Sequence, residues 1–236
     1  MSLLYLIRHA QASFGQADYD RLSELGHEQA RLLAVHLDRT GAGFDAIYLG
    51  SQLRHDQTLE AYRRVCSQKG NGLPPVCKSD FFNEYDAGSI LRTFVPILIR
   101  EEPGFEAQVA QMTTSNRSFE KVFEKVLQRW FDHEGEAHNF ESWASFTSRV
   151  QRGIRQIMDR EGSGKRVAVF TSGGPISAVV QKALGLSNQS TIRIASQIVN
   201  SSVSRFKYNG EAVMLFGFND ITHLELDDPD RLITYR

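Results

Sequence analysis

The sequence of 236 residues predicts an α/β fold: a three-layer α/β/α sandwich with a mainly parallel central sheet and an inserted helical cap. Short apolar runs alternate with amphipathic helical segments in the first third of the chain. The alternation stops between about 87 and 140 and resumes with a strongly apolar strand at 166–170. Strands that alternate with helices favour parallel pairing, with helices covering both faces of the sheet.

The first third reads as β-α-β-α-β. Residues 3–7 (LLYLI) form a short apolar run that predicts a buried strand. A helix is expected at about 25–40, where alanine and leucine recur at helical spacing. Residues 44–49 predict a second strand and residues 53–67 a second helix. After a Pro-Pro break, residues 76–82 predict a third strand.

The remaining two thirds contain the cap and the rest of the sheet. Residues 87–140 are helical and amphipathic, with apolar and aromatic side chains at helical spacing. A helix at about 142–161 precedes the strand at 166–170, which leads through a Gly-Gly turn into another helix. Residues 203–208 and 212–219 flank an Asn-Gly pair, which predicts an antiparallel hairpin.

Length, charge and cysteine content restrict the class of protein. A chain of this length can bury one sizeable core, so residues 1–236 are expected to form a single domain with the cap at about 87–140. The formal net charge of -1 gives no electrostatic footprint for nucleic acid or an anionic membrane. Two cysteines are too few for a disulfide framework, and the N-terminus lacks a signal-peptide pattern. We therefore expect a cytoplasmic protein that binds neither nucleic acid nor membrane.

Polar side chains gather after the ends of the predicted strands, which is where ligands bind in open α/β sheets. Two arginines, a histidine, a carboxylate and a Ser-Gly pair at a helix start are the parts of a phosphate-monoester site. The guanidinium fork binds phosphoryl oxygens bidentately, and a helix N-terminus adds unpaired amide donors. The candidate residues are Arg8, His9, Arg54, Glu84, Ser172 and Gly173.

His9 is the expected nucleophile. Neutral imidazole can attack phosphorus when one ring nitrogen is free and the other is held as a donor, often by a backbone carbonyl. Neighbouring Arg8 and Arg54 are expected to lower the pKa of His9 and keep it unprotonated. Glu84 follows a strand end and is the expected source of the proton for the leaving oxygen. These residues predict a phosphoryl-transfer enzyme.

The segment LYLIRHAQ at residues 4–11 resembles the strand and RHG signature of the histidine phosphatase superfamily, which includes the cofactor-dependent phosphoglycerate mutases. Other segments are similar to motifs of this superfamily in the same order. They are LSELGHEQA (22–30), SQLRHDQT (51–58), NEYDAG (83–88), ESWASFTSRV (141–150), VAVFTSGGPI (167–176) and NSSVSRF (200–206).

The resemblance implies roles for the candidate residues. His9 becomes phosphorylated, Arg8 and Arg54 bind the phosphoryl oxygens, and Glu84 acts as general acid and then base. The implied substrate is a small phosphomonoester or another phosphorylated small molecule. Neither a metal nor an organic cofactor is implied.

Two positions depart from the superfamily pattern. Ala10 replaces a glycine, a change that the backbone tolerates if φ stays negative. Ser172 replaces the second histidine, which hydrogen-bonds the transferred phosphoryl group. Ser172 can donate a neutral hydrogen bond and Gly173 its amide, and losing one electrostatic donor costs about 10²–10³ in rate. Two alternatives stay open. Ser172 could serve only as a helix N-cap, or another histidine such as His223 could supply the missing hydrogen bond. The histidines expected to be solvated or structural are His27, His36, His55, His133 and His138.

Three functions stay open at this stage: a phosphomonoesterase, a mutase that returns the phosphoryl group to its substrate, and a non-catalytic module that binds a phospholigand or a protein. Cations in residues 89–140 are scattered and balanced by glutamates, which favours hydrolysis over a mutase. The departure at Ser172 favours the non-catalytic module, whereas the presence of the other candidate residues favours an enzyme. The aromatic run 119–143 is expected to form the core of the cap, with an apolar substrate pocket as the alternative.

Overall fold

The computed structural model describes residues 2–13, 20–112, 114–133 and 140–235. Within these residues a six-stranded sheet has the order β3-β2-β4-β1-β5-β6. Neighbours from β3 to β1 pair in parallel, whereas β5 pairs antiparallel with both β1 and β6. The sheet is therefore mostly parallel and ends in the predicted hairpin. The strands are β1 (Ser2–Arg8), β2 (Ala46–Leu49), β3 (Val76–Lys78), β4 (Arg166–Thr171), β5 (Val203–Tyr208) and β6 (Val213–Asp220).

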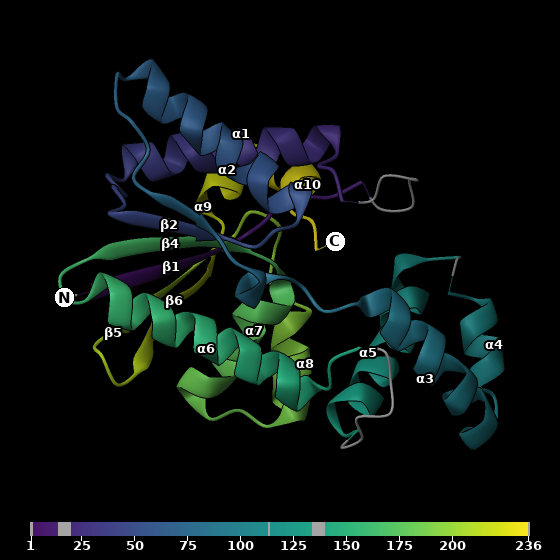
Figure 1. Cartoon of the computed structure of the whole chain (residues 1–236). Coiled ribbons are helices and arrows are strands. Elements are labelled where there is room, and N and C mark those ends of the chain that lie inside the picture. The colour runs from purple at the N-terminus through teal and green to yellow at the C-terminus, as the bar shows by residue number, and fades with distance from the viewer. Residues whose placement is uncertain (1, 14–19, 113, 134–139, 236) are drawn as a thin grey trace.

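Helices cover both faces of the sheet and give the predicted three layers (Figure 1). One face carries α1 (Glu24–Arg39), α2 (Leu53–Gln68), α9 (Thr222–Glu225) and α10 (Pro229–Leu232). The other face carries α6 (Trp143–Glu161), α7 (Gly173–Leu184) and α8 (Asn188–Ala195).

Strand β4 lies inside the sheet and separates two apolar cores. Val167 and Val169 belong to the core that includes α6 and α7, whereas Ala168 and Phe170 belong to the core beneath α1 and α2. Successive side chains of a strand point to opposite faces, so a continuous apolar run is what a strand covered on both faces requires. This explains why 166–170 is the strongest strand signal in the sequence.

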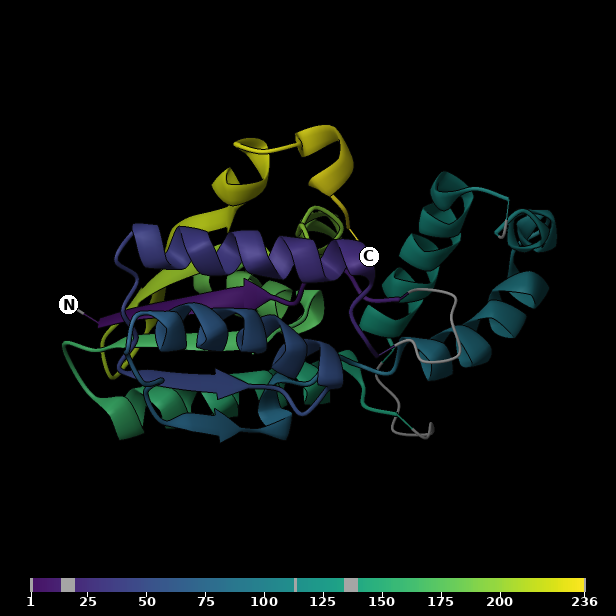
Figure 2. The same ribbon diagram turned by 90° about the horizontal axis from the view of Figure 1, so that it is seen from above.

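The cap consists of α3 (Ala87–Glu101), α4 (Phe105–Ala110) and α5 (Asn116–Phe131). Figure 2 shows these helices beside the end of the sheet toward which β1 points. Val122, Val126 and Trp130 of α5 are fully buried and recur every four residues, as one face of a helix does. The helices occupy the segment in which we expect a cap; one domain with an insertion stays a prediction.

The third strand is shorter than its apolar pattern predicts. It ends at Lys78, and a 3-10 helix, η1 (Asp80–Phe82), follows. The Ser79 side chain accepts a hydrogen bond from the Phe81 N–H and so begins that turn. Helices α8, α9 and α10 are absent from the sequence prediction, since a helix of four to eight residues shows too few repeats of the helical period.

Candidate active site

The parallel pairing of β1 and β4 brings the ends of both strands to one place. Arg8 pairs with Thr171, and the His9 N–H donates to the Thr171 carbonyl at 2.8 Å. The residues that follow each pair, His9 and Ser172, therefore leave the sheet side by side. Figure 2 shows that β1 ends beside the cap helices.

His9 is held in one tautomer by its own loop. Its side chain is buried, and Nδ1 lies 2.7 Å from the Ala10 carbonyl oxygen. A carbonyl only accepts, so in the neutral ring Nδ1 carries the proton and the lone pair lies on Nε2. Burial lowers the pKa of His9 well below its usual range, and the charges of Arg54 and Arg8 lower it further. His9 is thus a neutral imidazole whose lone pair lies on Nε2.

The backbone around His9 is fixed by hydrogen bonds from distant segments. The Ala10 N–H donates to Thr58 Oγ1 at 3.1 Å. The His9 carbonyl accepts from the Ser201 N–H at 3.1 Å and from Asn200 Nδ2 at 3.3 Å. Ser201 has a φ of 60°, a left-handed conformation unusual for a residue with a Cβ. Ala10 does not have a positive φ, so the backbone accommodates alanine there.

Gly26 and Gln29 anchor the chain that follows His9 to α1. A Cβ on Gly26 would lie 2.1 Å from the Gln11 carbonyl oxygen, so only glycine permits this approach. Buried Gln29 accepts from the Gln11 N–H at 2.8 Å and donates to the Leu232 carbonyl at 2.7 Å. The Gly-x-x-Gln spacing of the first helix therefore joins the His9 loop to the C-terminal segment.

Glu84 lies against the start of α7. Its Oε2 accepts from the Gly174 N–H at 3.0 Å, and Oε1 is placed so that a Cβ on Gly174 would lie 2.0 Å from it. Burial raises the pKa of Glu84, while the hydrogen bond from Gly174 and the Arg54 charge oppose the rise. A carboxyl group with a raised pKa keeps its proton to higher pH, as a general acid must.

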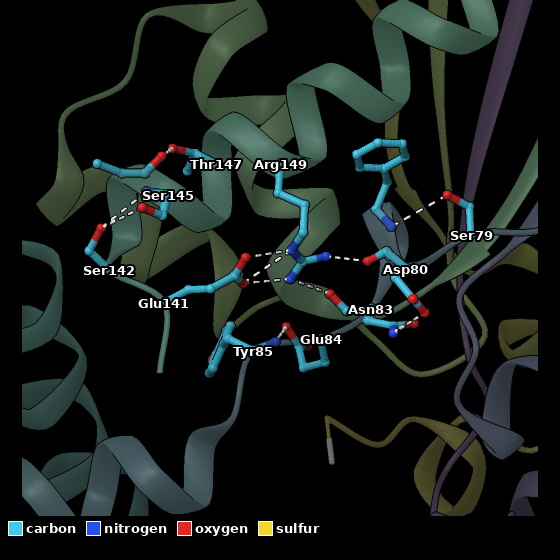
Figure 3. Close-up of polar contacts among 12 residues, drawn as sticks. Ser79, Asp80, Asn83, Glu84, Tyr85, Glu141, Ser142, Ser145, Thr147 and Arg149 are labelled. Carbon is cyan, nitrogen blue, oxygen red and sulfur yellow. Dashed lines mark hydrogen bonds and ion pairs between the residues drawn. The ribbon is translucent and has the colours of Figure 1, made fainter. Parts of the chain in front are cut away.

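Arg149 of α6 positions the segment that carries Glu84 (Figure 3). Its Nε donates to Glu141 at 2.8 Å, Nη2 donates to the Asn83 carbonyl at 3.2 Å, and Nη1 donates to the Asp80 carbonyl. The guanidinium thus joins two carbonyls just before Glu84 to a carboxylate just before α6. The sequence contains Arg149 within the segment 141–150, but its part in this arrangement was not predicted.

Both predicted phosphate-binding arginines have protein partners here. Arg54 is 5% exposed, and its Nη1 donates to Asp20 at 2.6 Å. Arg8 donates through Nη2 to the Tyr235 carbonyl at 2.9 Å and through Nη1 to the Ile198 carbonyl. Arg8 nevertheless lines the pocket beside Gly173, and a Cβ on Gly173 would lie 3.8 Å from its Nε. An oxyanion bound by Arg54 would compete with Asp20.

Ser172 and His55 form a buried pair at the end of β4. Ser172 is the N-cap residue of α7, yet its side chain makes no capping hydrogen bond. Its Oγ instead lies 2.8 Å from His55 Nε2, and both residues are 0% exposed. The ring of His55 lies 5.7 Å from that of His9, centroid to centroid. Burial lowers the pKa of His55 to about 3, with the Arg54 charge contributing, so His55 is neutral.

A pocket of about 610 Å³ extends from the candidate residues to the cap and to α8. At one end it is lined by Arg8, Glu84, Gly173 and Gly174. It is also lined by Phe119, Phe123 and Leu127 of α5, by Ile192 and Arg193 of α8, and by Tyr235, whose carbonyl bonds Arg8. The rings of Phe119 and Phe123 stack with centroids 5.5 Å apart.

The aromatic run 119–143 therefore divides between the two predicted roles. Trp130 and Trp143 are buried and pack edge to face at 5.4 Å within the core, whereas Phe119 and Phe123 line the pocket.

The family model described as histidine phosphatase superfamily (branch 1) matches residues 4–93 and 105–221. The chain belongs to this superfamily. The part of α3 between the two matched ranges falls in the cap, which the sequence motifs also leave uncovered. No curated relative matches the chain at a significant level.

Solved structures of histidine phosphatases and their relatives share the fold. Bacillus stearothermophilus YhfR is 18% identical with a TM-score of 0.66, and the match covers 95% of this chain and all of the other. Phosphoglycerate mutase from Bacillus anthracis is 15% identical with a TM-score of 0.64, covering 95% of each chain. Phosphoserine phosphatase from Entamoeba histolytica, solved with 3-phosphoglyceric acid, is 19% identical with a TM-score of 0.62, covering 95% and 100%. At these identities the likeness shows the fold.

Within the superfamily, this chain departs from the pattern at position 172, where Ser172 stands in place of the second histidine and another histidine lies beside it. His223 bonds Ser201 through Nε2 at 2.9 Å, so the structure does not bring it to Ser172. The nearby histidine is His55, which is fully buried rather than solvated. His138 lies outside the described residues.

Neither a metal site nor a membrane-spanning helix is found in the described residues. No group of three or more histidine, cysteine, aspartate or glutamate side chains there could hold a metal ion. In the same part of the chain, no helix has the length and apolar character that crossing a membrane requires.

Proposed function

We propose that the protein is a phosphomonoester hydrolase that acts through a phosphohistidine at His9. The observation that carries this proposal is the tautomer of His9: Nδ1 bonds the Ala10 carbonyl, which leaves the nucleophilic lone pair on Nε2. Glu84 bonds the Gly174 amide close by and supplies a proton donor. Superfamily membership and the phosphatases among the structural neighbours support the same chemistry.

The reaction has two half-reactions. In the first, His9 Nε2 attacks phosphorus, the bond from phosphorus to the leaving oxygen breaks, and Glu84 gives its proton to that oxygen. In the second, a water molecule attacks the phosphohistidine, the N–P bond breaks, and the Glu84 carboxylate takes the proton of the water. Arg8, Arg54 and the Gly173 amide bind the phosphoryl oxygens throughout and stabilise the charge of the transition state.

The lining of the pocket favours hydrolysis over the mutase alternative. A mutase has to hold a second anionic group of its substrate, and this requires a surplus of cations beyond the phosphoryl site. The pocket lining contains Arg8 and Arg193, but also Glu84, Glu120 and Glu124. Carboxylates in the outer part of the pocket would repel a second phosphate or carboxylate of the substrate.

The apolar wall formed by Phe119 and Phe123 points to the kind of leaving group. Small polar phosphomonoesters would leave these side chains in contact with water, whereas a leaving group with an aromatic or aliphatic portion would bury them. We therefore propose phosphomonoesters with an apolar portion as the preferred substrates. The thiols of Cys66 and Cys77 are free, which is compatible with the cytoplasmic location that we propose.

The test is phosphoryl transfer from labelled substrates. The protein is incubated with a panel of ³²P-labelled phosphomonoesters and quenched in alkali. We expect a protein-bound label that is stable in alkali and labile in acid, together with released phosphate. His9→Ala should abolish both, and His27→Ala, which removes an exposed histidine, should retain both.

Three results would contradict the proposal. Neither label nor phosphate across the panel would exclude hydrolysis and transfer alike. Isomerised substrate without released phosphate would indicate a mutase. A label that survives in His9→Ala would place the phosphoryl group on another residue.

A further inference from the structure

Two fully buried polar side chains from distant segments meet beside His9. Ser172 directly follows β4 and His55 belongs to the first turn of α2, and they are joined by a 2.8 Å hydrogen bond. Within the described residues, His55 is the only hydrogen-bond partner of the Ser172 hydroxyl. Buried polar groups cost free energy unless they are paired, so this contact is a specific arrangement of the fold.

The ring of His55 fits in its place only because the neighbouring residue 50 has no side chain. A Cβ on Gly50 would lie 2.4 Å from His55 Nδ1, so the ring fits because residue 50 is glycine. At the opposite side of the ring, Nε2 meets the short side chain of Ser172. Gly50, His55 and Ser172 are thus fitted to one another.

We propose that His55 and Ser172 together supply the hydrogen bond to the transferred phosphoryl group that the superfamily obtains from a single histidine at position 172. His55 Nε2–H donates to Ser172 Oγ, and the Ser172 hydroxyl donates its proton to a phosphoryl oxygen held next to His9. Ser172 is then a catalytic residue and His55 a positioning residue. The inference rests on the function proposed above.

The chemistry of the pair supports this direction of donation. A serine hydroxyl has one proton and accepts through its lone pairs. Neutral His55 has one N–H, which the Gly50 backbone beside Nδ1 can hold there, so Nε2 donates once a bound dianion raises the pKa of His55 and the ring is protonated. When Nε2–H donates to the serine oxygen, the hydroxyl proton is left for another acceptor, and the first hydrogen bond polarises the second. The β1–β4 register places Ser172 beside His9, so the natural acceptor is an oxygen of the group that His9 attacks. A bound dianion would also raise the pKa of His55 and strengthen its donation.

A set of four variants tests the pair: Ser172→Ala, His55→Ala, the double variant with both changes, and His55→Ala combined with Ser172→His. We expect Ser172→Ala to lower kcat by about 10² with little change in KM. His55→Ala should lower kcat in the same direction, and the double variant should be no slower than Ser172→Ala. Moving the histidine, in the fourth variant, should restore kcat to within about tenfold of the wild type.

Binding of orthovanadate provides a measurement that needs no turnover. Vanadate resembles the trigonal transition state, so calorimetry on Ser172→Ala should give a Kd raised by about the factor that kcat loses. This readout separates the pair from the proposed function. If the wild type hydrolyses no phosphomonoester, the function fails, while weaker vanadate binding by Ser172→Ala still supports the donor pair.

Several results would overturn the donor pair. The proposal fails if Ser172→Ala keeps the kcat and the vanadate affinity of the wild type. It also fails if the wild type does not bind vanadate. Fully multiplicative losses in the double variant would show that the two side chains act separately. If His55→Ala does not fold, as judged by circular dichroism, His55→Gln takes its place, and Ser172→Ala with vanadate decides alone. His27→Ala serves as the matched control, since it removes an exposed histidine of the neighbouring helix.

Discussion

Replacing Glu84 with glutamine removes the proton that the leaving oxygen needs while it preserves the shape of the side chain. The glutamine carbonyl can still accept from the Gly174 N–H, which lies 3.0 Å from Glu84 Oε2 in the wild type. Glutamine has no proton to give to the leaving oxygen. General acid catalysis contributes about 10²–10⁴ in rate, so kcat for an alkyl phosphate should fall by that factor.

The loss should depend on the leaving group. An alkoxide is a strong base and leaves only with a proton, whereas a nitrophenolate leaves as a stable anion. Glu84→Gln should therefore slow the first half-reaction by about 10²–10⁴ for an alkyl phosphate and by less than about tenfold for nitrophenyl phosphate. The assay is single-turnover release of the alcohol or of nitrophenol, which isolates the acid role from the base role of Glu84 in the second half-reaction, with Glu60→Gln, a surface carboxylate of α2, as control. Equal losses for both substrates would refute the assignment of Glu84 as the acid.

The same variant predicts a change in pH dependence. Activity requires protonated Glu84 and neutral His9. Burial raises the pKa of Glu84 and lowers that of His9, so kcat/KM should fall as the pH rises past the Glu84 pKa and as it drops past the His9 pKa. Glu84→Gln should abolish the decline at high pH and retain the decline at low pH. A variant that keeps both limbs would assign the upper one to another group.

Three further predictions concern residues that support the site or its pocket. Arg149→Lys loses the planar fork that joins Glu141 to the backbone before Glu84. We therefore expect kcat to fall by about tenfold at nearly constant KM, and the free energy of unfolding in urea to fall by roughly 1.5–3 kcal/mol. An unchanged kcat would contradict a positioning role. Burial lowers the pKa of His223 to about 4, so the unfolded chain binds the proton first as the pH falls. The contribution of neutral His223 to the free energy of unfolding should be fully present above about pH 6.5 and lost as the pH falls toward 4. His223→Gln should therefore lose less free energy of unfolding between these two pH values, by on the order of 3 kcal/mol, as measured by urea unfolding. If the variant loses as much as the wild type, His223 is not the cause. Phe123→Ala should raise KM for aryl phosphates by about tenfold and leave KM for a small alkyl phosphate nearly unchanged, and equal changes would argue against an apolar subsite.

The layers of the fold could be predicted because they follow from local periodicity. The run at 166–170 is apolar at every position after Arg166, which only a strand covered on both faces requires, and it is β4. The third strand was predicted too long for a related reason. Apolar periodicity extends through Phe82, whose ring is buried, but Ser79 turns the backbone into a 3-10 helix before the ring enters the core. The predicted end of the strand was therefore wrong.

For the candidate site, position along the strands could be predicted and side-chain pairing could not. His9, Ser172 and Gly173 follow strand ends, and the β1–β4 register brings them together as the topology requires. The contact between His55 and Ser172 joins residues 117 positions apart and depends on how one ring fits against Gly50. Sequence spacing contains no information of that kind. The bond between Arg54 and Asp20 was missed for the same reason.

The fit of Gly50, His55 and Ser172 has a consequence for other chains of the superfamily. The His55 ring meets Ser172 through Nε2, and that ring is accommodated because residue 50 lacks a Cβ. If the pair replaces the second histidine, the three residues should change together: serine at the end of β4 should accompany histidine directly after the α2 arginine and glycine at the end of β2. An alignment in which serine at this position occurs equally often with and without that histidine would contradict the replacement. Joint occurrence would indicate that the donor was relocated to α2, and that its loss from β4 is no sign of a lost activity.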